Sequence, residues 1–380
     1  MKILVLGYIV KGPLGGLAWH HFQYVLGLIK LGHEVLFIED SDDYPACYNP
    51  ITFKCTVDPF FGLQFIKDLF KSFDLSNWAY FDAHSNLWFG RNRRKVFDFC
   101  KKADLVLNLS GINPVREYWQ NIPTRIFIDT DPGFVQINIL TKPNVMELAK
   151  AHNIFFSFAE NINTPSCTIP VDGFLWKPTR QPVFLSAWKI DRPRIDANWT
   201  TVMQWDSYKE LQYNDVKLGM KSKSFIPFYK LPKFVPNENL EISMGSSSAP
   251  RAKLVKLGWQ ISNPLHTTRD PQGFQDYIRT SKGEWTIAKQ GYVITNSGWF
   301  SERTLNYMAS GKPVIVQDTG FKNFLPTGQG LLCFSNLDEA IDQINRVNAE
   351  YEVHCSSARR IVEEHFNSTA VLSNLLANIT

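Results

Sequence analysis

Several common sequence signatures are absent from this 380-residue chain, and each absence narrows the class of protein. The six cysteines are scattered, with no C-x-x-C pair and no metal-ligand spacing, which argues against a zinc site or a disulfide framework. This scatter is typical of reduced, mostly buried thiols, so we expect a cytoplasmic protein that needs no metal. The motif G-x-G-x-x-G is also missing, and we therefore expect no dinucleotide cofactor.

Long apolar runs and a strong net charge are missing as well. The amino-terminal run MKILVLGYIV is too short to span a membrane, and we interpret it as a first strand and not as a signal peptide. Forty basic and thirty-six acidic residues leave a net charge of only +4, which does not argue for nucleic acid as a partner. We therefore expect a small-molecule or glycan partner and no transmembrane segment.

Apolar strand patterns alternate with helical patterns along the whole chain, and no repeat of solenoid period is visible. This order predicts parallel sheets covered by helices on both faces, in an α/β protein with two Rossmann-like, doubly wound domains facing a cleft. The length of 380 residues also favours two domains over one core. We place the first domain at residues 1–180, the second at 181–365, and a last helix at 366–380 that packs back on the first domain. The proline-rich segment 165–193 is the expected linker, and the aromatic-rich segment 40–94 an insertion.

The chain opens with a strand, a glycine-rich loop, a helix over residues 17–31 and a second strand. Gly12, Gly15 and Gly16 lie in or at the end of the loop, where a missing Cβ lets the backbone approach a ligand closely. A loop that merely turns tightly above the sheet explains the same glycines equally well.

The most informative stretch is TNSGWFSERTLNYMASGKPVIVQDTGF, residues 295–321. It predicts a turn, a helix, a tight Gly-Lys-Pro turn and a buried strand that ends at Gln317, followed by a loop. The start of a helix offers free N–H groups and a positive dipole, which suit a phosphate or diphosphate. Ligands in open α/β sheets lie at the carboxyl ends of strands, so the loop after Gln317 would face the same crevice.

This stretch resembles the donor-nucleotide region of glycosyltransferases of the GT-B fold, possessing a serine/glycine turn, an acidic helix, a G-x-P-V turn and a D-x-G loop. The similarity extends in outline over nearly the whole chain and in motif over about thirty residues, and spore-maturation-type glycosyltransferases are the nearest branch. It implies an enzyme that moves a sugar, a hexose or a related one, from a nucleotide-sugar co-substrate to an acceptor. It also implies that segment 40–94 shapes an acceptor pocket.

The resemblance implies roles for individual residues of the second half. Glu302 matches the glutamate that accepts hydrogen bonds from ribose hydroxyls. The neighbouring donor ribose and diphosphate candidates are Ser297, Gly298, Ser301 and Arg303, and Lys282 is favoured over Lys289 as a further cation for the diphosphate. The donor sugar would meet the loop formed by Gln317, Asp318, Thr319 and Gly320.

Two positions that distinguish the retaining members carry other residues. Counting back from Gly311 places Asn306 and Gly298 where those members have an E-x7-E pair. We therefore expect an inverting, metal-independent reaction. An Asx cap by Asp318 and a solvated helix-surface position for Arg303 are the competing structural interpretations.

On the acceptor side, His20 matches the general-base histidine of inverting GT-B enzymes, at the start of the first helix. An imidazole that titrates near neutrality can accept the proton of an acceptor hydroxyl. Asp129 and Asp131, after a strand of the same domain, are the expected carboxylates that orient it. Asp129-Thr130-Asp131 also spells D-x-D, which we interpret as a strand-end loop and not as a metal site.

Two other functions remain open on this evidence. A nucleotide-sugar 2-epimerase shares the fold and an S-G-x-x-x-E turn, which Ser297, Gly298 and Glu302 match. A catalytically silent nucleotide-sugar-binding protein would share the donor site alone. The donor sugar, the nucleotide base and the acceptor cannot be inferred from the sequence.

Overall fold

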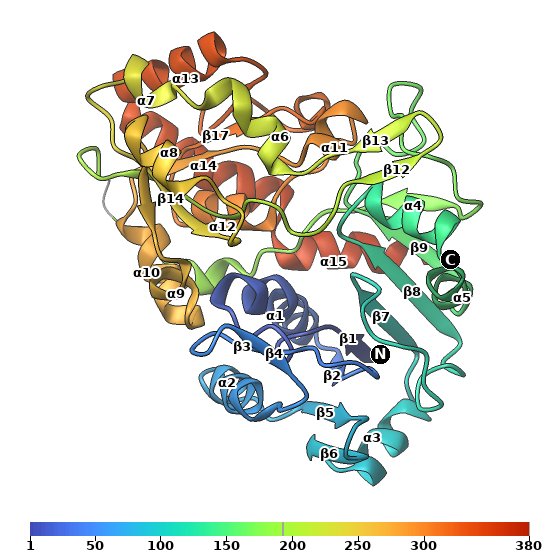
Figure 1. Ribbon diagram of the computed structural model, residues 1–380. Coiled ribbons are helices and arrows are strands. Elements are labelled where there is room, and N and C mark those ends of the chain that lie inside the picture. Colours follow the sequence, from blue (N-terminus) through green and yellow to red (C-terminus); the bar gives the residue numbers. More distant parts are fainter. Residues whose placement is uncertain (192–193, 380) are drawn as a thin grey trace.

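Parallel strands form two separate sheets in the computed structural model, which describes residues 1–191 and 194–379 (Figure 1). The first domain contains, in chain order, β1 (Lys2–Leu6), α1 (Gly15–Lys30), β2 (Glu34–Asp40), β3 (Cys47–Asn49), β4 (Lys54–Thr56), α2 (Phe60–Lys71), β5 (Trp78–Asp82), β6 (Leu87–Gly90), α3 (Arg93–Cys100), β7 (Leu105–Leu109), β8 (Thr124–Asp129), α4 (Phe134–Thr141), α5 (Pro143–Lys150), β9 (Ile154–Ser157) and β10 (Trp176–Pro178).

The second domain follows a connecting segment that holds the short 3-10 helix η1 (Leu185–Ala187). It contains β11 (Trp199–Gln204), β12 (Leu211–Tyr213), β13 (Val216–Leu218), α6 (Lys221–Phe225), η2 (Ile226–Phe228), α7 (Leu231–Phe234), β14 (Leu240–Gly245), α8 (Arg251–Lys256), β15 (Gln260–Ser262), α9 (Pro264–Thr268), α10 (Pro271–Thr280), β16 (Gly283–Thr286), α11 (Gln290–Ile294), α12 (Glu302–Ala309), β17 (Val314–Gln317), η3 (Phe321–Asn323), β18 (Leu331–Phe334), α13 (Leu337–Ala349) and α14 (Tyr351–His365). The last helix is α15 (Ser368–Ala377).

Both sheets have the doubly wound topology that the sequence predicts. The first has the strand order β10-β9-β8-β7-β1-β2-β5-β6, and only its β5–β6 pair is antiparallel. The second, β15-β14-β11-β16-β17-β18, is parallel throughout. The central strands are short runs of buried β-branched and leucine residues, such as KILVL in β1, as parallel strands covered on both faces require.

The segment between residues 40 and 94 is not an insertion, in contrast to the prediction. It supplies α2 and the sheet strand β5, which pairs in parallel with β2. Its irregular pattern comes from the antiparallel hairpin β3–β4 and from the edge strand β6, both short and half exposed. The sequence pattern also gave no sign of the hairpin β12–β13.

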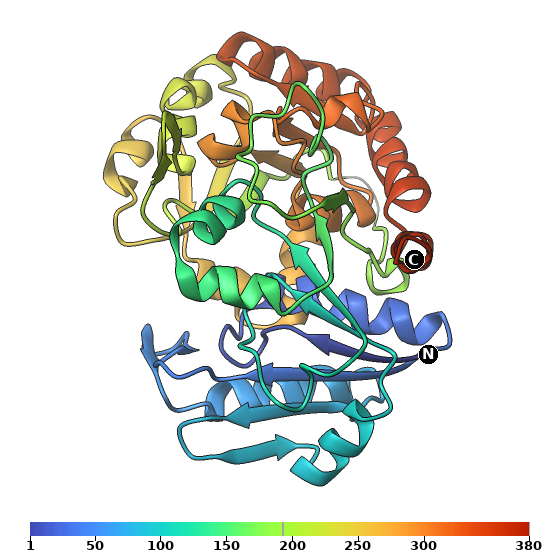
Figure 2. The same ribbon diagram turned by 90° about the vertical axis from the view of Figure 1, so that its right-hand side faces the viewer.

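The two domains meet along two seams. On one, α1 packs against α10, α12 and α15, and the largest hydrophobic cluster continues from the first domain into the second. Gly27 of α1 allows this contact, because a Cβ there would lie 2.6 Å from Leu372 Cδ1 of α15. On the other seam, Phe134 of α4 packs with Leu218, the last residue of β13, and with Tyr292 of α11. Figure 2 shows the two domains one above the other, with α15 beside α1 at the side of the chain termini.

None of the helices in the described part of the chain is both long and apolar enough to cross a membrane.

Candidate functional site

Each sheet contains one point at which its strand order reverses. In the second sheet this point lies between β11 and β16, because the chain continues from β11 towards β14 on one side and from β16 towards β17 on the other. Loops that leave adjacent strands in opposite directions open a crevice at the carboxyl ends of those strands. The site is therefore expected beyond Gln204 and Thr286, where α6, α11 and α12 begin.

A buried lysine without a partner lies at this crevice. Lys221 is the first residue of α6 and only 9% exposed, and no hydrogen bond or ion pair of its ammonium is found within the described residues. Burial and the positive charge of Arg303 lower the pKa of Lys221 well below its usual value. Since a buried cation is costly without a counter-ion, this arrangement favours an anionic ligand. Lys221 was not predicted as a site residue, because residues 205–225 show no periodic pattern.

Arg303 lies beside Lys221 and is held by the sheet. Its Nε donates to Glu284 Oε1, and its Nη2 donates to Thr286 Oγ1 at 3.0 Å. Glu284 is fully buried within β16, so the guanidinium is fixed in the crevice and is not a solvated surface group. Arg303 therefore lies in the crevice, but its positive charge is already paired with the internal carboxylate of Glu284.

Glu302 faces the first domain as well as the cations. It is the first residue of α12, where its negative charge complements the helix dipole, and none of the described residues hydrogen-bonds its carboxylate. Its charge acts on Lys221 and Arg303 on one side and on Tyr8 and His20 on the other. Because Glu302 already supplies a negative charge at this helix start, a phosphate is better placed near Lys221.

His20 lies within α1 against aromatic neighbours. It is 8% exposed, its ring meets His21 and Phe158 edge-on, and its buried Nδ1 has no hydrogen-bond partner in the described structure. Burial lowers the pKa of His20 below its usual 6.5, and the charge of Glu302 partly opposes this effect. The imidazole is therefore neutral at neutral pH, as a general base must be.

The two carboxylates predicted to orient His20 have other partners. Asp129 is fully buried and accepts hydrogen bonds from Gln136 and Ser157, and burial raises its pKa to about 7. Asp131 faces the second domain and not His20. The carboxylate whose charge acts on His20 is that of Glu302. The sequence did not reveal that the two residues lie close together, because they are 282 positions apart in the chain (302 − 20).

Asp131 bridges the two domains through Lys289. Lys289 Nζ donates to both carboxylate oxygens of Asp131, at 2.9 and 3.0 Å, and the hydroxyls of Tyr208 and Tyr292 donate to the same carboxylate. The ammonium also lies 4.8 Å from the ring centre of Phe134 and 4.5 Å from that of Tyr208. Lys289 follows β16 at its carboxyl end, so this interdomain bridge lies at the crevice.

Lys282 is not a crevice residue, which corrects the choice made from the sequence. It precedes β16 and therefore lies at the amino edge of the sheet, opposite to the crevice. Its ammonium pairs with Glu238 at 2.7 Å and lies over the Trp199 ring. Of the two flanking lysines, Lys289 is the one at the carboxyl edge.

The loops around Ser297 and Gly320 are bound to the first domain. Asn161 donates from Nδ2 to the carbonyl oxygens of Asn296 and Gly320, and its backbone N–H donates to the Ser297 carbonyl. A Cβ on Gly298 would lie 2.9 Å from Asn161 N, so glycine is required there for close approach. These turns form an interdomain seam, and the sequence could not reveal Asn161 as their partner.

The predicted sugar-binding loop makes internal hydrogen bonds. Gln317 Oε1 accepts from the Ala288 N–H, Thr319 donates to the Trp299 carbonyl, and Asp318 accepts from the Gly320 N–H. The contact of Asp318 with the Gly320 N–H is a local side-chain-to-backbone bond of the kind that the Asx interpretation expected. Lys322 pairs with the second carboxylate oxygen of Asp318 at 2.8 Å.

The serines of the helix start differ from each other. Ser297 donates to the Tyr292 carbonyl and accepts from the Trp299 N–H, so its hydroxyl stabilises the turn. Ser301 occupies the cap position of α12 without capping it, and its buried hydroxyl has no partner in the described structure. Ser301 therefore remains available to a ligand.

The glycines of the first loop serve the domain contact. A Cβ on Gly15 would lie 2.4 Å from the Asp270 carbonyl oxygen, and one on Gly16 would lie 3.2 Å from the Phe274 ring, both in the second domain. A Cβ on Gly12 would meet side chains of its own domain, Leu17 at 2.5 Å and the Tyr8 ring at 3.4 Å. The loop amides are also occupied, because Glu39 accepts from the N–H groups of residues 9, 10 and 11.

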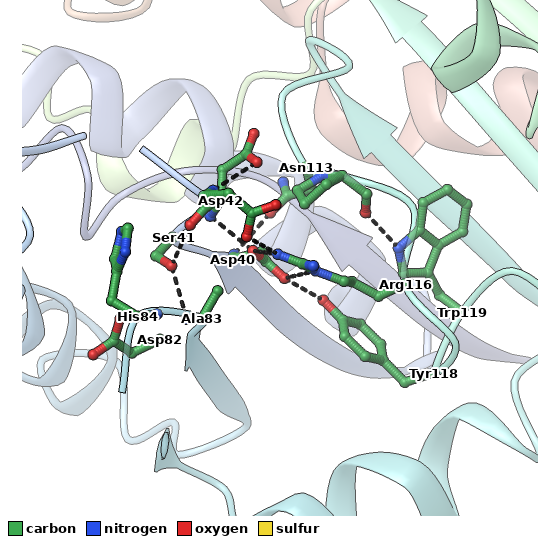
Figure 3. Close-up of polar contacts among 12 residues, drawn as sticks. Asp40, Ser41, Asp42, Asp82, Ala83, His84, Asn113, Arg116, Tyr118 and Trp119 are labelled. Carbon is green, nitrogen blue, oxygen red and sulfur yellow. Dashed lines mark hydrogen bonds and ion pairs between the residues drawn. The ribbon is translucent and has the colours of Figure 1, made fainter. Parts of the chain in front are cut away.

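Polar contacts fix the acceptor-side loops at the ends of β2 and β5. Figure 3 shows Arg116 paired with the buried Asp40, which Tyr118 also contacts at 3.4 Å. Ser41 Oγ accepts from the Ala83 N–H at 2.9 Å and so ties the two loops together. These contacts connect the loops after β2, β5 and β7 at this edge of the first domain.

No group of three or more potential metal-ligating side chains occurs among the described residues. A hollow of 830 Å³ does occur, but it lies between α1, α2 and α10, and neither Lys221 nor Glu302 lines it. The ion pair between Asp131 and Lys289 joins the two domains at the crevice.

Known family models and curated proteins give no match to the chain. Solved structures do share its fold. An alpha-glucosyltransferase in complex with UDP-glucose and DNA containing an abasic site has 12% identity and a TM-score of 0.61, over 99% of this chain and 98% of that chain. Anabaena HepE in complex with UDP and glucose has 12% identity and a TM-score of 0.59 over 100% of both chains. AviGT4, a glycosyltransferase of avilamycin A biosynthesis, has 12% identity and a TM-score of 0.53, over 100% and 97%. The predicted two-domain GT-B fold is confirmed.

Proposed function

We propose that this chain is a glycosyltransferase that moves a sugar from a nucleoside diphosphate sugar to an acceptor hydroxyl. The observation that carries the proposal is the buried, unpartnered Lys221 at the switch point of the second sheet. Lys289 and Arg303 lie close enough for their charges to act on it. A diphosphate is the anion that such a group of cations would hold best.

The same cations would assist the reaction. When the bond between the anomeric carbon and the diphosphate oxygen breaks, negative charge grows on the leaving nucleoside diphosphate. Fixed cations in a crevice with little water stabilise that charge more than they stabilise the bound donor. We propose that Lys221 and Lys289 do so, without a metal ion.

His20 is the proposed base on the opposite wall. The acceptor oxygen attacks the anomeric carbon, the bond to the diphosphate breaks, and the hydroxyl proton passes to His20 Nε2. Glu302 acts on His20 through its charge and favours the imidazolium that forms. Attack from the side opposite to the diphosphate inverts the anomeric centre.

Uridine diphosphate is the first nucleotide to test, because solved structures of this fold contain UDP or UDP-glucose. One of those neighbours binds DNA. We propose an acceptor other than nucleic acid for this chain, because its net charge of +4 is small.

A thermal-shift screen of nucleoside diphosphates and their sugars tests the proposal. A ligand at a hundredfold excess over its Kd raises stability by about 2.7 kcal/mol, which a melting curve resolves easily. We expect one nucleoside diphosphate and its sugars to raise Tm. The proposal fails if none of them does so at millimolar concentration.

The screen is followed by turnover with the stabilising donor. Release of nucleoside diphosphate in the presence of an acceptor supports transfer, and formation of an epimeric nucleotide sugar would instead support the 2-epimerase. Binding without either product, under conditions in which the fold is intact, would support a silent binding protein.

A further inference from the structure

Exposed apolar side chains are concentrated on one short segment of the first domain. Residues 44–60, here called the hairpin lip, comprise the approach to β3, the hairpin β3–β4 and the start of α2. Five of its large apolar side chains are exposed over about half of their area or more: Tyr44 51%, Ile51 66%, Phe53 63%, Val57 46% and Phe60 71%. The core gains nothing from side chains in these positions.

The hairpin lip holds these side chains in a defined turn. Asn49 Oδ1 accepts from the N–H groups of Ile51 and Thr52, and the Phe53 N–H donates to the Asn49 carbonyl oxygen. Phe53 has a φ of 58°, a left-handed conformation that is unfavourable for a bulky residue. A strained, structured turn that presents apolar groups to solvent indicates a contact made with something outside the chain.

The hairpin lip adjoins the acceptor side of the site. The Tyr48 N–H donates to the Lys11 carbonyl in the loop after β1, and Gly62 packs so tightly on Val10 that a Cβ would lie 2.0 Å from its carbonyl oxygen. That loop leaves β1 at the point where the strand order of the first sheet reverses. Figure 2 shows the hairpin standing out from the first domain.

The charge and size of the hairpin lip bear on its possible occupants. The lip itself carries one acidic and one basic residue, and Asp43 beside it is paired with Arg116, so it offers no electrostatic attraction to an anionic membrane or a nucleic acid. Its 17 residues (44 to 60) fall short of the roughly 20–30 a side of a standard interface between two copies. A lipid surface without net charge requires neither an attracting charge nor an interface of that size.

We propose that the hairpin lip inserts into a zwitterionic lipid surface, which presents the acceptor to the crevice. The docking itself is independent of the proposed function, and only the role of the lipid surface as the source of the acceptor rests on it. Aromatic and aliphatic side chains on an otherwise polar segment are the usual means by which a protein lies on a bilayer without spanning it. The acceptor is accordingly an amphiphile with a hydroxyl-bearing head.

Vesicle flotation of the whole chain tests the proposal, with phosphatidylcholine vesicles and with vesicles that also contain phosphatidylglycerol. The test variant is Ile51→Ser/Phe53→Ser/Phe60→Ser, and the matched control is Val171→Ser/Leu175→Ser, at sites 88% and 76% exposed between β9 and β10. We expect the wild-type chain to float with phosphatidylcholine alone, at low and high salt. The test variant should bind at least tenfold more weakly, and the control should bind as the wild type does.

Three outcomes would overturn the proposal. The first is no binding of the wild type to phosphatidylcholine, or binding only to anionic vesicles that high salt abolishes. The second is an equal loss of binding in the control variant. The third is a concentration-dependent dimer in lipid-free ultracentrifugation that the test variant alone loses, which would make a second copy the occupant.

Thermal shift with UDP on all three proteins separates this proposal from the proposed function. Retained UDP stabilisation in the test variant demonstrates an intact fold and donor site. Vesicle binding without any nucleotide stabilisation of the wild type would sink the transferase and leave the lipid contact in place.

Discussion

Single charged side chains decide the chemistry of the crevice. Lys221 is the first residue of α6, and Glu302 and Arg303 are the first two residues of α12. The charges of Arg303 and Glu302 act on Lys221, and the charge of Glu302 also acts on Arg303. Arg303 is ion-paired with the buried Glu284, whereas the ammonium of Lys221 makes no hydrogen bond or ion pair with the described residues, and only the charges of Glu284 and Glu302 favour its ionised form. An anion bound beside Lys221 would offset the remaining cost of its burial.

The pH dependence of turnover tests His20. Since burial lowers the pKa of His20 below 6.5, the base form predominates at and above pH 6.5, and activity should fall only at lower pH. His20→Gln should reduce kcat by about 10²–10⁴-fold, the usual contribution of a general base, and abolish this acidic limb. Donor binding should be unchanged. An unaltered pH profile with near-normal kcat would exclude His20 as the base.

Glu302→Gln tests whether that glutamate acts on His20 or on the ribose. The charge of Glu302 raises the pKa of His20, so its removal should lower that pKa further and move the acidic limb of kcat to lower pH. If the ribose role implied by sequence is the true one, the affinity for nucleoside diphosphate should fall instead, with the limb in place.

At the scale of elements, the loops that follow β8 and β16 join the two domains at the crevice. The loop after β8 carries Asp131, and the end of β16 carries Lys289, so the first domain supplies the counter-ion for a cation of the second. In the proposed function, a diphosphate would compete with this internal carboxylate for the same ammonium.

Asp131→Asn should therefore strengthen the binding of nucleoside diphosphate, by several-fold, because the competing charge is removed while the side chain keeps its size. Titration calorimetry of wild type and variant measures the difference. A weaker affinity in the variant would mean that Asp131 positions Lys289 for the ligand and does not compete with it.

The contact between α1 and α10 depends on a missing Cβ. Gly15→Ala would force a methyl group to within 2.4 Å of a backbone carbonyl of the other domain, so we expect a loss of about 1–3 kcal/mol in unfolding free energy. Gly12→Ala is the control, because its Cβ would meet no backbone atom, only the movable end of the Leu17 side chain and, at 3.4 Å, the Tyr8 ring. Chemical denaturation of both variants measures the effect, and equal stabilities would contradict it.

At the scale of the whole molecule, the sequence predicts the fold better than the site. Alternating strand and helix patterns suffice for two doubly wound domains, because buried parallel strands are continuous apolar runs, as in β1 and β17. Glu302 and His20 were assigned to the site from the resemblance to GT-B glycosyltransferases, and Arg303 as the neighbour of Glu302; their roles stay predictions.

The remaining assignments depend on contacts between distant segments, which no local pattern contains. Asn161 binds the turns at Asn296 and Gly320 through hydrogen bonds across more than 130 positions of the chain. Asp131 meets Lys289 in the same way, and Lys221 lies in a stretch of short elements without periodicity. Lys282 was favoured for its small-residue Ser-Lys-Gly turn, but it precedes β16 and so lies at the amino edge of the sheet.

Titration calorimetry of UDP with three proteins tests the central claim most directly. The proteins are the wild type, Lys221→Ala, and Lys223→Ala as a control on the same helix, whose side chain is 51% exposed. Removal of a charge-assisted hydrogen bond costs about 1.5–3 kcal/mol, so Lys221→Ala should weaken binding by at least about tenfold. Lys223→Ala should bind as the wild type does. Equal affinity in all three proteins, or no binding to the wild type, would contradict the donor site described here.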